Sequence, residues 1–164
     1  MAVATDTRKT GIAAGPTLLG ASAVAASITG TLTETTLATV TVPGGAMGLN
    51  GGLHIYTTWS MTNSANTKTQ RVRLGGAAGT IYAGVALTTA TTLHDFRRIR
   101  NRNSLASQVG SLNAAAGSTF SSSGVAVVTS TIDTSVSQDV AITAQLGNTG
   151  ETITLESYEV WLVP

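Results

Sequence analysis

Hydrophobic and polar residues alternate with a period of two from Thr31 almost to the end of the chain. This period is typical of β-strands that bury one face, because successive side chains on a strand point to opposite sides. The clearest stretch is LHIYTTWSMT, which begins at Leu53 and predicts a strand with one hydrophobic and one polar face. The hydrophobic face holds Leu53, Ile55, Trp59 and Met61, and the polar face holds His54, Tyr56, Thr58 and Ser60.

Turn residues separate nine stretches of this kind. Proline and paired glycines interrupt the alternation at residues 43–45 and 75–76, and the sequence NTG at 148–150 predicts a short hairpin loop. The strand over 80–88 is predicted to bury Ile81, Ala83, Val85 and Leu87, and the last strand to bury Ile153, Leu155, Trp161 and Val163. The predicted strands are 35–42, 53–62, 70–74, 80–88, 92–101, 104–111, 125–132, 138–146 and 152–163, with a loop at 113–124.

Many short strands with turns between them predict an all-β protein built as an antiparallel β-sandwich. Threonine, valine and isoleucine are concentrated in these stretches, and their branched side chains fit a pleated sheet better than a helix. Eight or nine strands match a jelly roll, and a chain without cysteine lacks the Cys–Trp–Cys core of antibody domains. We therefore predict a jelly-roll-like sandwich domain over residues 35–164, preceded by an extended N-terminal arm over residues 1–34.

The arm region has the outline of a secretory signal peptide at residues 8–28, where basic residues precede a mildly apolar run and then small residues. Gly11, Gly15, Pro16 and Gly20 break that run, which argues against a signal. No stretch reaches the ~20 apolar residues of a membrane-spanning helix, so no membrane partner is expected. We interpret the segment as an arm that lies against a neighbouring subunit.

Charged residues make up 10% of the chain, well below the ~25% of a typical soluble domain. A monomer of this composition would expose much uncharged surface, which favours a chain that is partly covered by partners. The net charge of +1 gives no strong global attraction for nucleic acid. We expect a homo-oligomer, with a trimer preferred, and no nucleic-acid partner.

The titratable residues form no catalytic constellation. His94 is next to Asp95, but adjacent residues on a strand point to opposite faces and do not orient each other as a catalytic triad requires. The acidic residues single out no pair for glycoside hydrolysis, and no cluster of cysteine, histidine or carboxylate residues has the spacing of a metal site. The sequence therefore predicts a protein that is not an enzyme and has no cofactor and no metal.

Seven of the nine basic residues fall in two short windows. Alternate arginines on a strand stand about 6.5–7 Å apart on one face, and each guanidinium can bind a carboxylate or phosphate with two hydrogen bonds. We expect a dock for an acidic partner surface, and the alternative is a solvated face that discourages aggregation between sheet edges. The windows are Lys68, Arg71 and Arg73, then Arg97, Arg98, Arg100 and Arg102, and the candidate partner-binding residues are Arg71, Arg73, Arg98, Arg100 and Arg102.

Seven aromatic residues are present in the whole chain. Trp59 and Trp161 occupy hydrophobic positions of their predicted strands and are expected to anchor the core. A platform that binds sugars would need exposed aromatic side chains, and the candidates are Tyr56, Tyr82 and Tyr158. The alternative is that these tyrosines lie at the rims of the sheets and bind nothing.

Three stretches together resemble a group of small all-β virion proteins of tailed bacteriophages. They are TLATVTVPGGAMGLNGGLHIYTTWSMTNSANTKTQRVRLGG, IRNRNSLASQVG and NTGETITLESYEVWLVP, and the resemblance covers residues 36–164. Its most specific elements are WS-x-TNSAN-x-K, which begins at Trp59, and RNRN, which begins at Arg100.

The resemblance implies a structural component of a phage particle, located in the virion. Our leading hypothesis is a decoration or cement protein of the head, which binds the major capsid protein or other virion proteins through the arm and the arginines. The alternative is a tail-fibre or collar module that recognises receptors or glycans. A third possibility is a secreted β-sandwich adhesin.

Overall fold

A computed structural model of the chain describes residues 15–112 and 126–164. Within these ranges the chain forms eleven β-strands and no helix, and so no helix that could cross a membrane. The all-β prediction is confirmed. The strands are β1 (Thr17–Ser22), β2 (Ala26–Thr29), β3 (Thr35–Val42), β4 (Gly52–Met61), β5 (Lys68–Leu74), β6 (Thr80–Leu87), β7 (Thr92–Asn101), β8 (Gln108–Leu112), β9 (Val127–Ser130), β10 (Gln138–Leu146) and β11 (Thr152–Val163).

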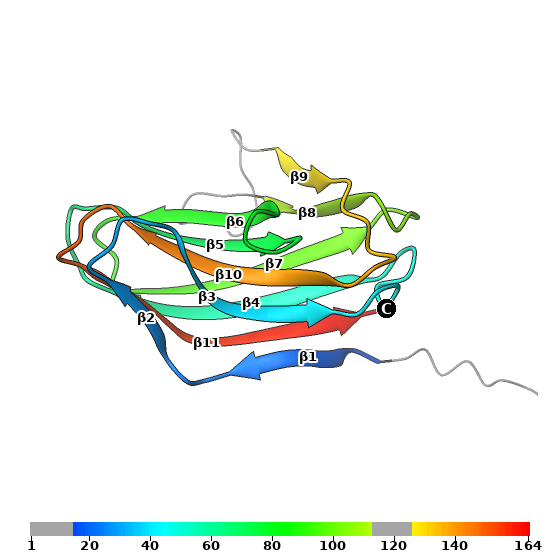
Figure 1. Cartoon of the computed structure of the whole chain (residues 1–164), viewed down its shortest axis with the longest axis horizontal. Coiled ribbons are helices and arrows are strands. Elements are labelled where there is room, and N and C mark those ends of the chain that lie inside the picture. The colour runs from blue at the N-terminus through cyan, green and yellow to red at the C-terminus, as the bar shows by residue number, and fades with distance from the viewer. Residues whose placement is uncertain (1–14, 113–125) are drawn as a thin grey trace, which may run out of the picture.

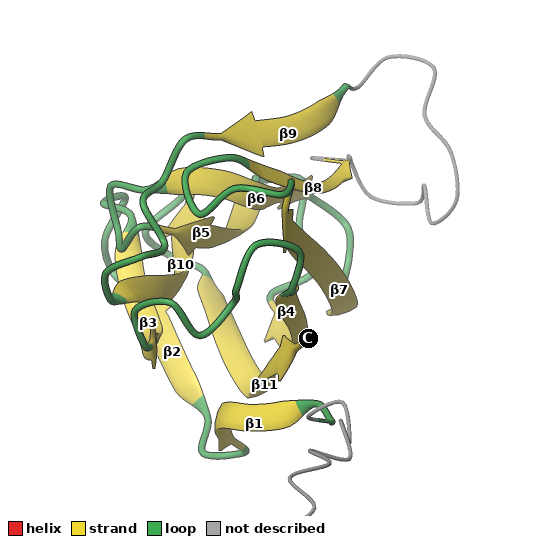
Figure 2. Ribbon diagram, turned by 90° about the vertical axis from the view of Figure 1, so that its right-hand side faces the viewer, coloured by secondary structure: helices red, strands yellow, loops and turns green. Residues whose placement is uncertain are grey.

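The strands form two antiparallel sheets that pack face to face. The larger sheet has the order β1-β11-β4-β7-β8-β9, with β2 also paired to β11, and the smaller sheet has the order β3-β10-β5-β6. Figure 2 shows β3, β10 and β5 in one layer and β11, β4 and β7 in the other. When β1 and β2 are taken as one edge and β8 and β9 as an insertion, the eight positions follow the jelly-roll order 1-8-3-6 and 2-7-4-5. The predicted jelly-roll sandwich is therefore the observed fold.

The strand bounds agree closely with the alternation in the sequence. β3, β7, β10 and β11 have the predicted bounds, and β4, β5 and β6 differ by at most two residues at an end. β8 begins at Gln108 rather than at residue 104, because the chain turns through Asn103, whose φ is 52°. The predicted loop at 113–124 lies outside the described residues.

The N-terminal region differs from the expectation of a separate arm. Residues 17–22 and 26–29 are strands that pair with β11 of the same chain, at the edge of the larger sheet. Figure 1 shows β1 running beside β11 along one edge of the sandwich. The physical reason is length, since β11 has 12 residues and its edge accommodates two short strands one after the other. Residues 1–14 of the expected arm lie outside the described residues.

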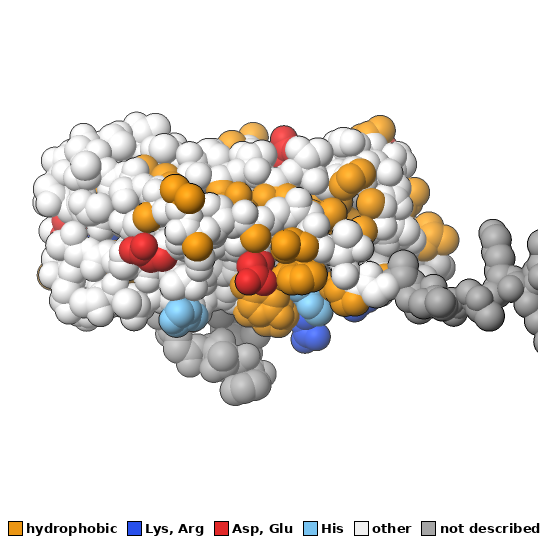
Figure 3. Space-filling model, turned by 90° about the horizontal axis from the view of Figure 1, so that it is seen from below, with side chains coloured by type: hydrophobic (Ala, Val, Ile, Leu, Met, Phe, Trp, Pro, Cys, Tyr) orange, Lys and Arg blue, Asp and Glu red, His pale blue; other side chains and the backbone are white. Residues whose placement is uncertain are grey.

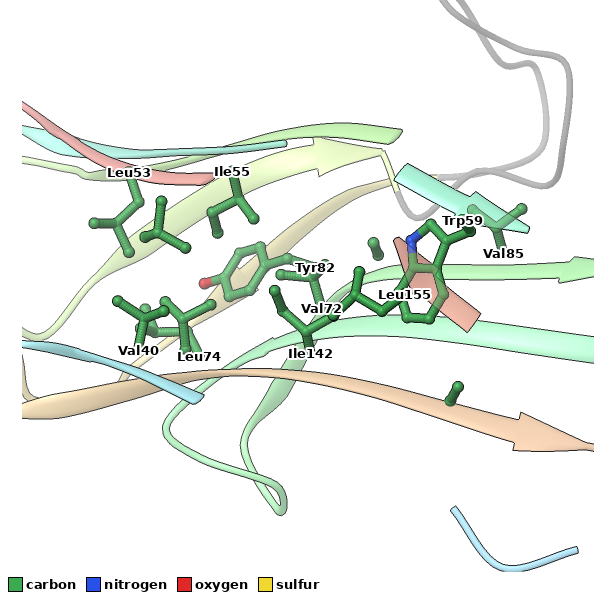
Figure 4. Close-up of a cluster of buried hydrophobic side chains, with 14 of the residues drawn as sticks. Val40, Leu53, Ile55, Trp59, Val72, Leu74, Tyr82, Val85, Ile142 and Leu155 are labelled. Carbon is green, nitrogen blue, oxygen red and sulfur yellow. The ribbon is translucent and has the colours of Figure 1, made fainter. Parts of the chain in front are cut away.

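The core lies between the two sheets and is made of the inward faces that the alternation predicted. Leu53, Ile55 and Trp59 of β4 face Val72 and Leu74 of β5, and all five are at most 1% exposed. Figure 4 shows these side chains converging between the two layers. Burial of this contiguous apolar cluster is the main source of stability for a sandwich of this size.

Three aromatic residues, Tyr82, Tyr158 and Trp161, are placed on the opposite side from the one predicted, and Tyr158 packs against the core instead of lying exposed. Tyr82 is completely buried, whereas Trp161 lies on the outer face, half-buried. In β6, a bulge leaves Tyr82 without a pairing partner, between Ile81 and Ala83. In β11, another bulge follows Leu155. Each extra residue reverses the alternation beyond it, so the predictions that Trp161 anchors the core and that Tyr82 is exposed are wrong.

One end of the sandwich is held by a buried ion pair, which we call the Lys68 clasp. Lys68 Nζ lies 3.4 Å from Glu151 Oε2 and donates hydrogen bonds to Thr88 O (2.7 Å) and Ser64 Oγ (3.0 Å). The Glu151 carboxylate also accepts hydrogen bonds from the Ser64 hydroxyl and from Asn66 Nδ2, the latter at 2.9 Å. The hydrogen bonds from Ser64 and Asn66, with that from Lys68, hold the pKa of Glu151 below its ordinary value. The clasp joins the loops that follow β4, β6 and β10.

The other end is held by a network of amides, which we call the Asn101 clasp. Asn101 Nδ2 donates to Gly48 O (2.6 Å) and to Thr134 Oγ1 (3.0 Å), and its Oδ1 accepts from Gln108 Nε2 (3.0 Å). The Thr134 hydroxyl in turn donates to Leu105 O at 2.8 Å. Asn101 and Gln108 are buried, so these bonds satisfy groups that water cannot reach. The clasp joins the loops that follow β3, β7 and β9.

Candidate functional site

Of the candidate partner-binding arginines, Arg71 and Arg73 lie on the outer face of the smaller sheet, on β5. Both are bound within the chain by Glu34, whose Oε2 lies 3.0 Å from Arg71 Nη1 and 3.0 Å from Arg73 Nη2. Arg73 Nε donates to the second carboxylate oxygen, also at 3.0 Å, and so holds Glu34 with two bonds. Thr143 donates a further hydrogen bond to the same carboxylate at 2.5 Å. The single carboxylate of Glu34 is therefore shared by both arginines and offsets one of their two positive charges inside the molecule.

The protonation of Glu34 follows from these partners. Partial burial opposes ionisation of the carboxyl, but hydrogen bonds from Arg73 and Thr143 and the charges of Arg71 and Arg73 outweigh it. The net effect holds the pKa of Glu34 below its ordinary value of 4.5. The carboxylate is therefore ionised at neutral pH and pins the β2–β3 connection to β5 and β10.

The second arginine window lies on the other side of the sandwich. On β7, Arg97, Ile99 and Asn101 are buried, so Arg98 and Arg100 belong to the outer face of the larger sheet. Arg98 is exposed, and Arg100 donates to Asn50 O (3.2 Å) and Pro164 O (3.4 Å). Arg102 is exposed beyond the end of β7. The five candidate arginines therefore do not form one basic face.

Aromatic side chains lie beside these arginines, in register across three adjacent strands. One row across the outer face runs Trp161 (β11), His54 (β4) and Arg98 (β7), and the next runs Glu159, Tyr56 and Phe96. We call these two rows on β11, β4 and β7 the aromatic face. Leu18 of β1 extends the first row next to Trp161 and is 46% exposed.

The rings of the aromatic face contact one another and leave surface open to solvent. Tyr56 and Phe96 stack with centroids 4.6 Å apart, and His54 meets Phe96 edge-on at 5.4 Å. The Arg98 guanidinium carbon lies 6.0 Å from the Phe96 centroid, within range of a cation–π attraction. Tyr56 remains 44% exposed and Phe96 41%. Figure 3 shows histidine, basic, acidic and hydrophobic side chains gathered along one side of the molecule.

A shallow hollow of about 190 Å³ adjoins the Tyr56–Phe96 stack. Its rim carries polar groups, because the Thr58 hydroxyl and His94 Nδ1 lie 3.2 Å apart across β4 and β7. These groups can donate and accept hydrogen bonds, and the rings offer apolar surface. The hollow can therefore hold a small group in contact with the sheet, but it does not enclose one.

His54 is held in its neutral form by its surroundings. Burial among its neighbours, followed by the positive charges of Arg100 and Arg98, lowers the pKa of this imidazole. Its Nε2 atom is buried and has no hydrogen-bond partner among the described residues. At neutral pH the aromatic face thus carries its positive charge on the arginines of β7 and its negative charge on Glu159 of β11.

In the part of the chain that the structure describes, the histidines and acids do not meet in an arrangement typical of a catalytic site. Asp95 points inward, where Arg97 Nη2 lies 2.7 Å away and Gln70 Nε2 donates to it at 3.1 Å, while His94 points to solvent. Burial raises the pKa of Asp95 despite these partners. In residues 15–112 and 126–164, no group of three histidine, aspartate or glutamate side chains is placed to hold a metal ion.

Sequence reasoning missed three parts of this arrangement. Glu34 carries no local signal, because its partners are about 40 and 110 residues away in the sequence. Phe96 and Trp161 were not predicted to share a face with Tyr56. For Phe96 the signal was present, since the strand alternation places it with His94 and Arg98 on the side opposite Asp95. For Trp161 the alternation pointed to the wrong side because of the bulge.

Comparisons with known proteins add little to this description. No protein-family model and no curated protein matches the chain. One solved structure, described as "Structure of infectious bursal disease virus Gx strain", aligns over 90% of this chain and 40% of that chain. The TM-score is 0.31 and the identity 11%, so the likeness carries no conclusion about function.

Proposed function

We propose that this protein is a structural component of a virus particle, of the tailed-phage kind that its sequence resembles, and that it decorates the head. In this role the protein contributes surface and no chemistry. Many copies bound to a shell would each bury area against it, and binding to the assembled state stabilises that state by mass action. Jelly rolls are common in viral capsid proteins, although a fold by itself does not determine function.

The observation that carries the proposal is the position of the two signature motifs. Lys68, Ser64 and Asn66 of the TNSAN-x-K element form the Lys68 clasp, and Asn101 of the RNRN element forms the Asn101 clasp. Both elements therefore serve to tie loops together at the two ends of the sandwich. The distinctive residues of these motifs stabilise loops and supply no reactive group, as we expect for a protein whose role is assembly.

The test is to locate the protein on particles. Particles are purified from the virus that encodes the chain, labelled with an antibody against a C-terminal tag and imaged by electron microscopy. We expect label distributed over the head. Its absence from purified particles would overturn the proposal, and label confined to the tail would replace decoration of the head with a fibre or collar role.

The role of the arm in attachment must be tested with a deletion shorter than the predicted arm of residues 1–34. Removing residues 1–30 would also remove β1 and β2, which pair with β11. Deleting residues 2–14 leaves both strands in place and tests attachment through the arm alone. We expect lower occupancy on particles, with full occupancy counting against a role for the arm.

A glycan-binding module of a fibre or collar is a second candidate, favoured by the hollow beside the exposed Tyr56–Phe96 stack. Sugars bind aromatic faces flanked by hydroxyl and imidazole groups, which Thr58 and His94 supply. A glycan array probed with the full chain tests it. Binding that is lost in Tyr56→Ser and kept in Val136→Ser, which changes an exposed hydrophobic residue outside the aromatic face, would favour this candidate over decoration.

A further inference from the structure

The aromatic face carries opposite charges on its two sides. Glu159 stands on β11, Arg98 and Arg100 stand on β7, and the rings of β4 and β7 lie between them. Glu156, also on β11, adds a second carboxylate, which accepts a hydrogen bond from the Ser60 hydroxyl of β4. The face is thus acidic at one flank, aromatic in the middle and basic at the other flank.

Such a layout is complementary to itself. In the order β11-β4-β7, a two-fold axis that runs along β4 between two facing sheets places β11 of one copy opposite β7 of the other. The acidic flank then meets the basic flank twice, and the aromatic centres meet each other. Two sheets pack face to face in this manner when their strands are nearly aligned.

We propose that the aromatic face is a two-fold contact between two copies of this chain. In it, Trp161 of one copy faces Arg98 of its partner, since both lie in the first row at equal distance from β4. Glu159 lies one row further along and reaches the same arginine diagonally. In this contact the stacked rings of Tyr56 and Phe96, which are exposed in the single chain, become buried.

Several observations favour a second copy over other occupants. A large acidic partner, such as the capsid surface expected for the arginines, would place Glu159 against like charge. A basic partner would meet the same difficulty at Arg98. A second copy places its basic flank against the acidic flank of the first, and its aromatic rings against the aromatic rings of the first. The contact goes beyond the proposed function and does not depend on it, because it concerns how copies associate with each other.

The test exchanges charges across the proposed contact and follows association of the full chain by sedimentation over micromolar to near-millimolar concentration. Arg98→Glu and Glu159→Arg should each raise the dimer dissociation constant by about tenfold or more, as expected for a pair of close interfacial charges. The double variant, Arg98→Glu with Glu159→Arg, should return it to within a few-fold of the starting value, because the attraction is restored with its sign reversed.

Matched controls carry the same charge changes elsewhere. Arg102→Glu lies beyond β7, and Asp139→Arg lies on the smaller sheet, so neither should change the dissociation constant. A chain that stays monomeric at every concentration would overturn the proposal. So would association that responds to the controls as strongly as to the two exchanges, or a double variant no better than the single ones.

A cross-link gives a second measurement that does not depend on affinity. The chain has no cysteine, so an introduced one is unique. Thr58→Cys lies on the outer face of β4, near the proposed axis, and should give disulfide-linked dimers under mild oxidation. Thr39→Cys, exposed on β3 of the smaller sheet, should give few. Equal yields from the two variants would contradict a contact through the aromatic face.

Discussion

The Tyr82 ring fills the space in the core that a side chain on Gly110 would need, because a Cβ atom on Gly110 would lie 2.1 Å from Cδ1 of that ring. The Tyr82 hydroxyl makes a 2.6 Å hydrogen bond with Ser130 Oγ of β9. Ser130 in turn donates to Gln108 Oε1 at 2.8 Å. The bare backbone of Gly110 is therefore what allows Tyr82 to connect β6 with β8 and β9.

Gly110→Ala should destabilise the protein by about 1–3 kcal/mol, because the methyl group must displace a ring that is already packed. Urea denaturation measures the loss. Gly15→Ala is the control, since a Cβ there meets no atom within 4 Å, and it should be neutral. In a Tyr82→Leu background the alanine should cost less than in the native chain. An equal cost in both backgrounds would mean that the clash with the ring is not the cause.

The two tryptophans should differ in their contact with solvent. Trp59 is fully buried, and its indole N–H donates to Thr57 Oγ1 at 2.9 Å, whereas Trp161 lies on the outer face. The variant Trp161→Phe should therefore emit at shorter wavelength and resist quenching by acrylamide, and Trp59→Phe should be readily quenched. Fluorescence of the two single-tryptophan variants at low protein concentration tests this. Similar quenching of the two would contradict the bulge after Leu155.

Glu34 should make stability depend on pH in the acid range. Its pKa is lower in the folded chain than in the unfolded one, so its contribution is complete above the unfolded value near 4.5 and is lost as pH falls through the folded value. At neutral pH, Glu34→Gln should cost about 1 kcal/mol, a charge-assisted hydrogen bond reduced by solvent screening.

The difference in unfolding free energy between Glu34→Gln and the native chain should shrink as the pH is lowered below 4.5, and denaturation at several pH values measures it. Asp139→Asn, which removes a carboxylate bonded to the Thr41 hydroxyl on the smaller sheet, is the control for loss of one negative charge. A cost for Glu34→Gln that does not vary with pH would show that the ion pairs with Arg71 and Arg73 contribute nothing.

In the Lys68 clasp, a substitution of one charged residue should lower stability more than a substitution of both. Lys68→Met leaves the Glu151 carboxylate in the sandwich end without its cation, and removing one member of a buried pair is strongly destabilising. Lys68→Met combined with Glu151→Gln removes both charges and should recover part of the lost stability. Thermal unfolding of the two variants tests this order. A double variant less stable than Lys68→Met would contradict the account of the clasp as a coupled ion pair.

Much of the fold could be predicted from local alternation. The strand over 35–42 and those over 92–101, 138–146 and 152–163 have the predicted bounds, because each is set by turn residues at its ends and by a regular inward face. The inward positions of Leu53, Ile55 and Trp59 follow from the same rule. The candidate site was less predictable, since only its arginines and Tyr56 were singled out.

The sequence by itself determined that this chain folds as an antiparallel β-sandwich, because a period of two, repeated between turns, gives each strand one apolar face that a second sheet can bury. Tertiary structure alone decided which strands pair, which aromatic residues face outward, and which charges cancel. A bulge moves Trp161 to the surface, and a contact across some 40 residues gives Arg71 and Arg73 a shared partner in Glu34. Strand partners and bulges depend on how segments far apart in the sequence pack against each other, and the local sequence pattern does not contain that information.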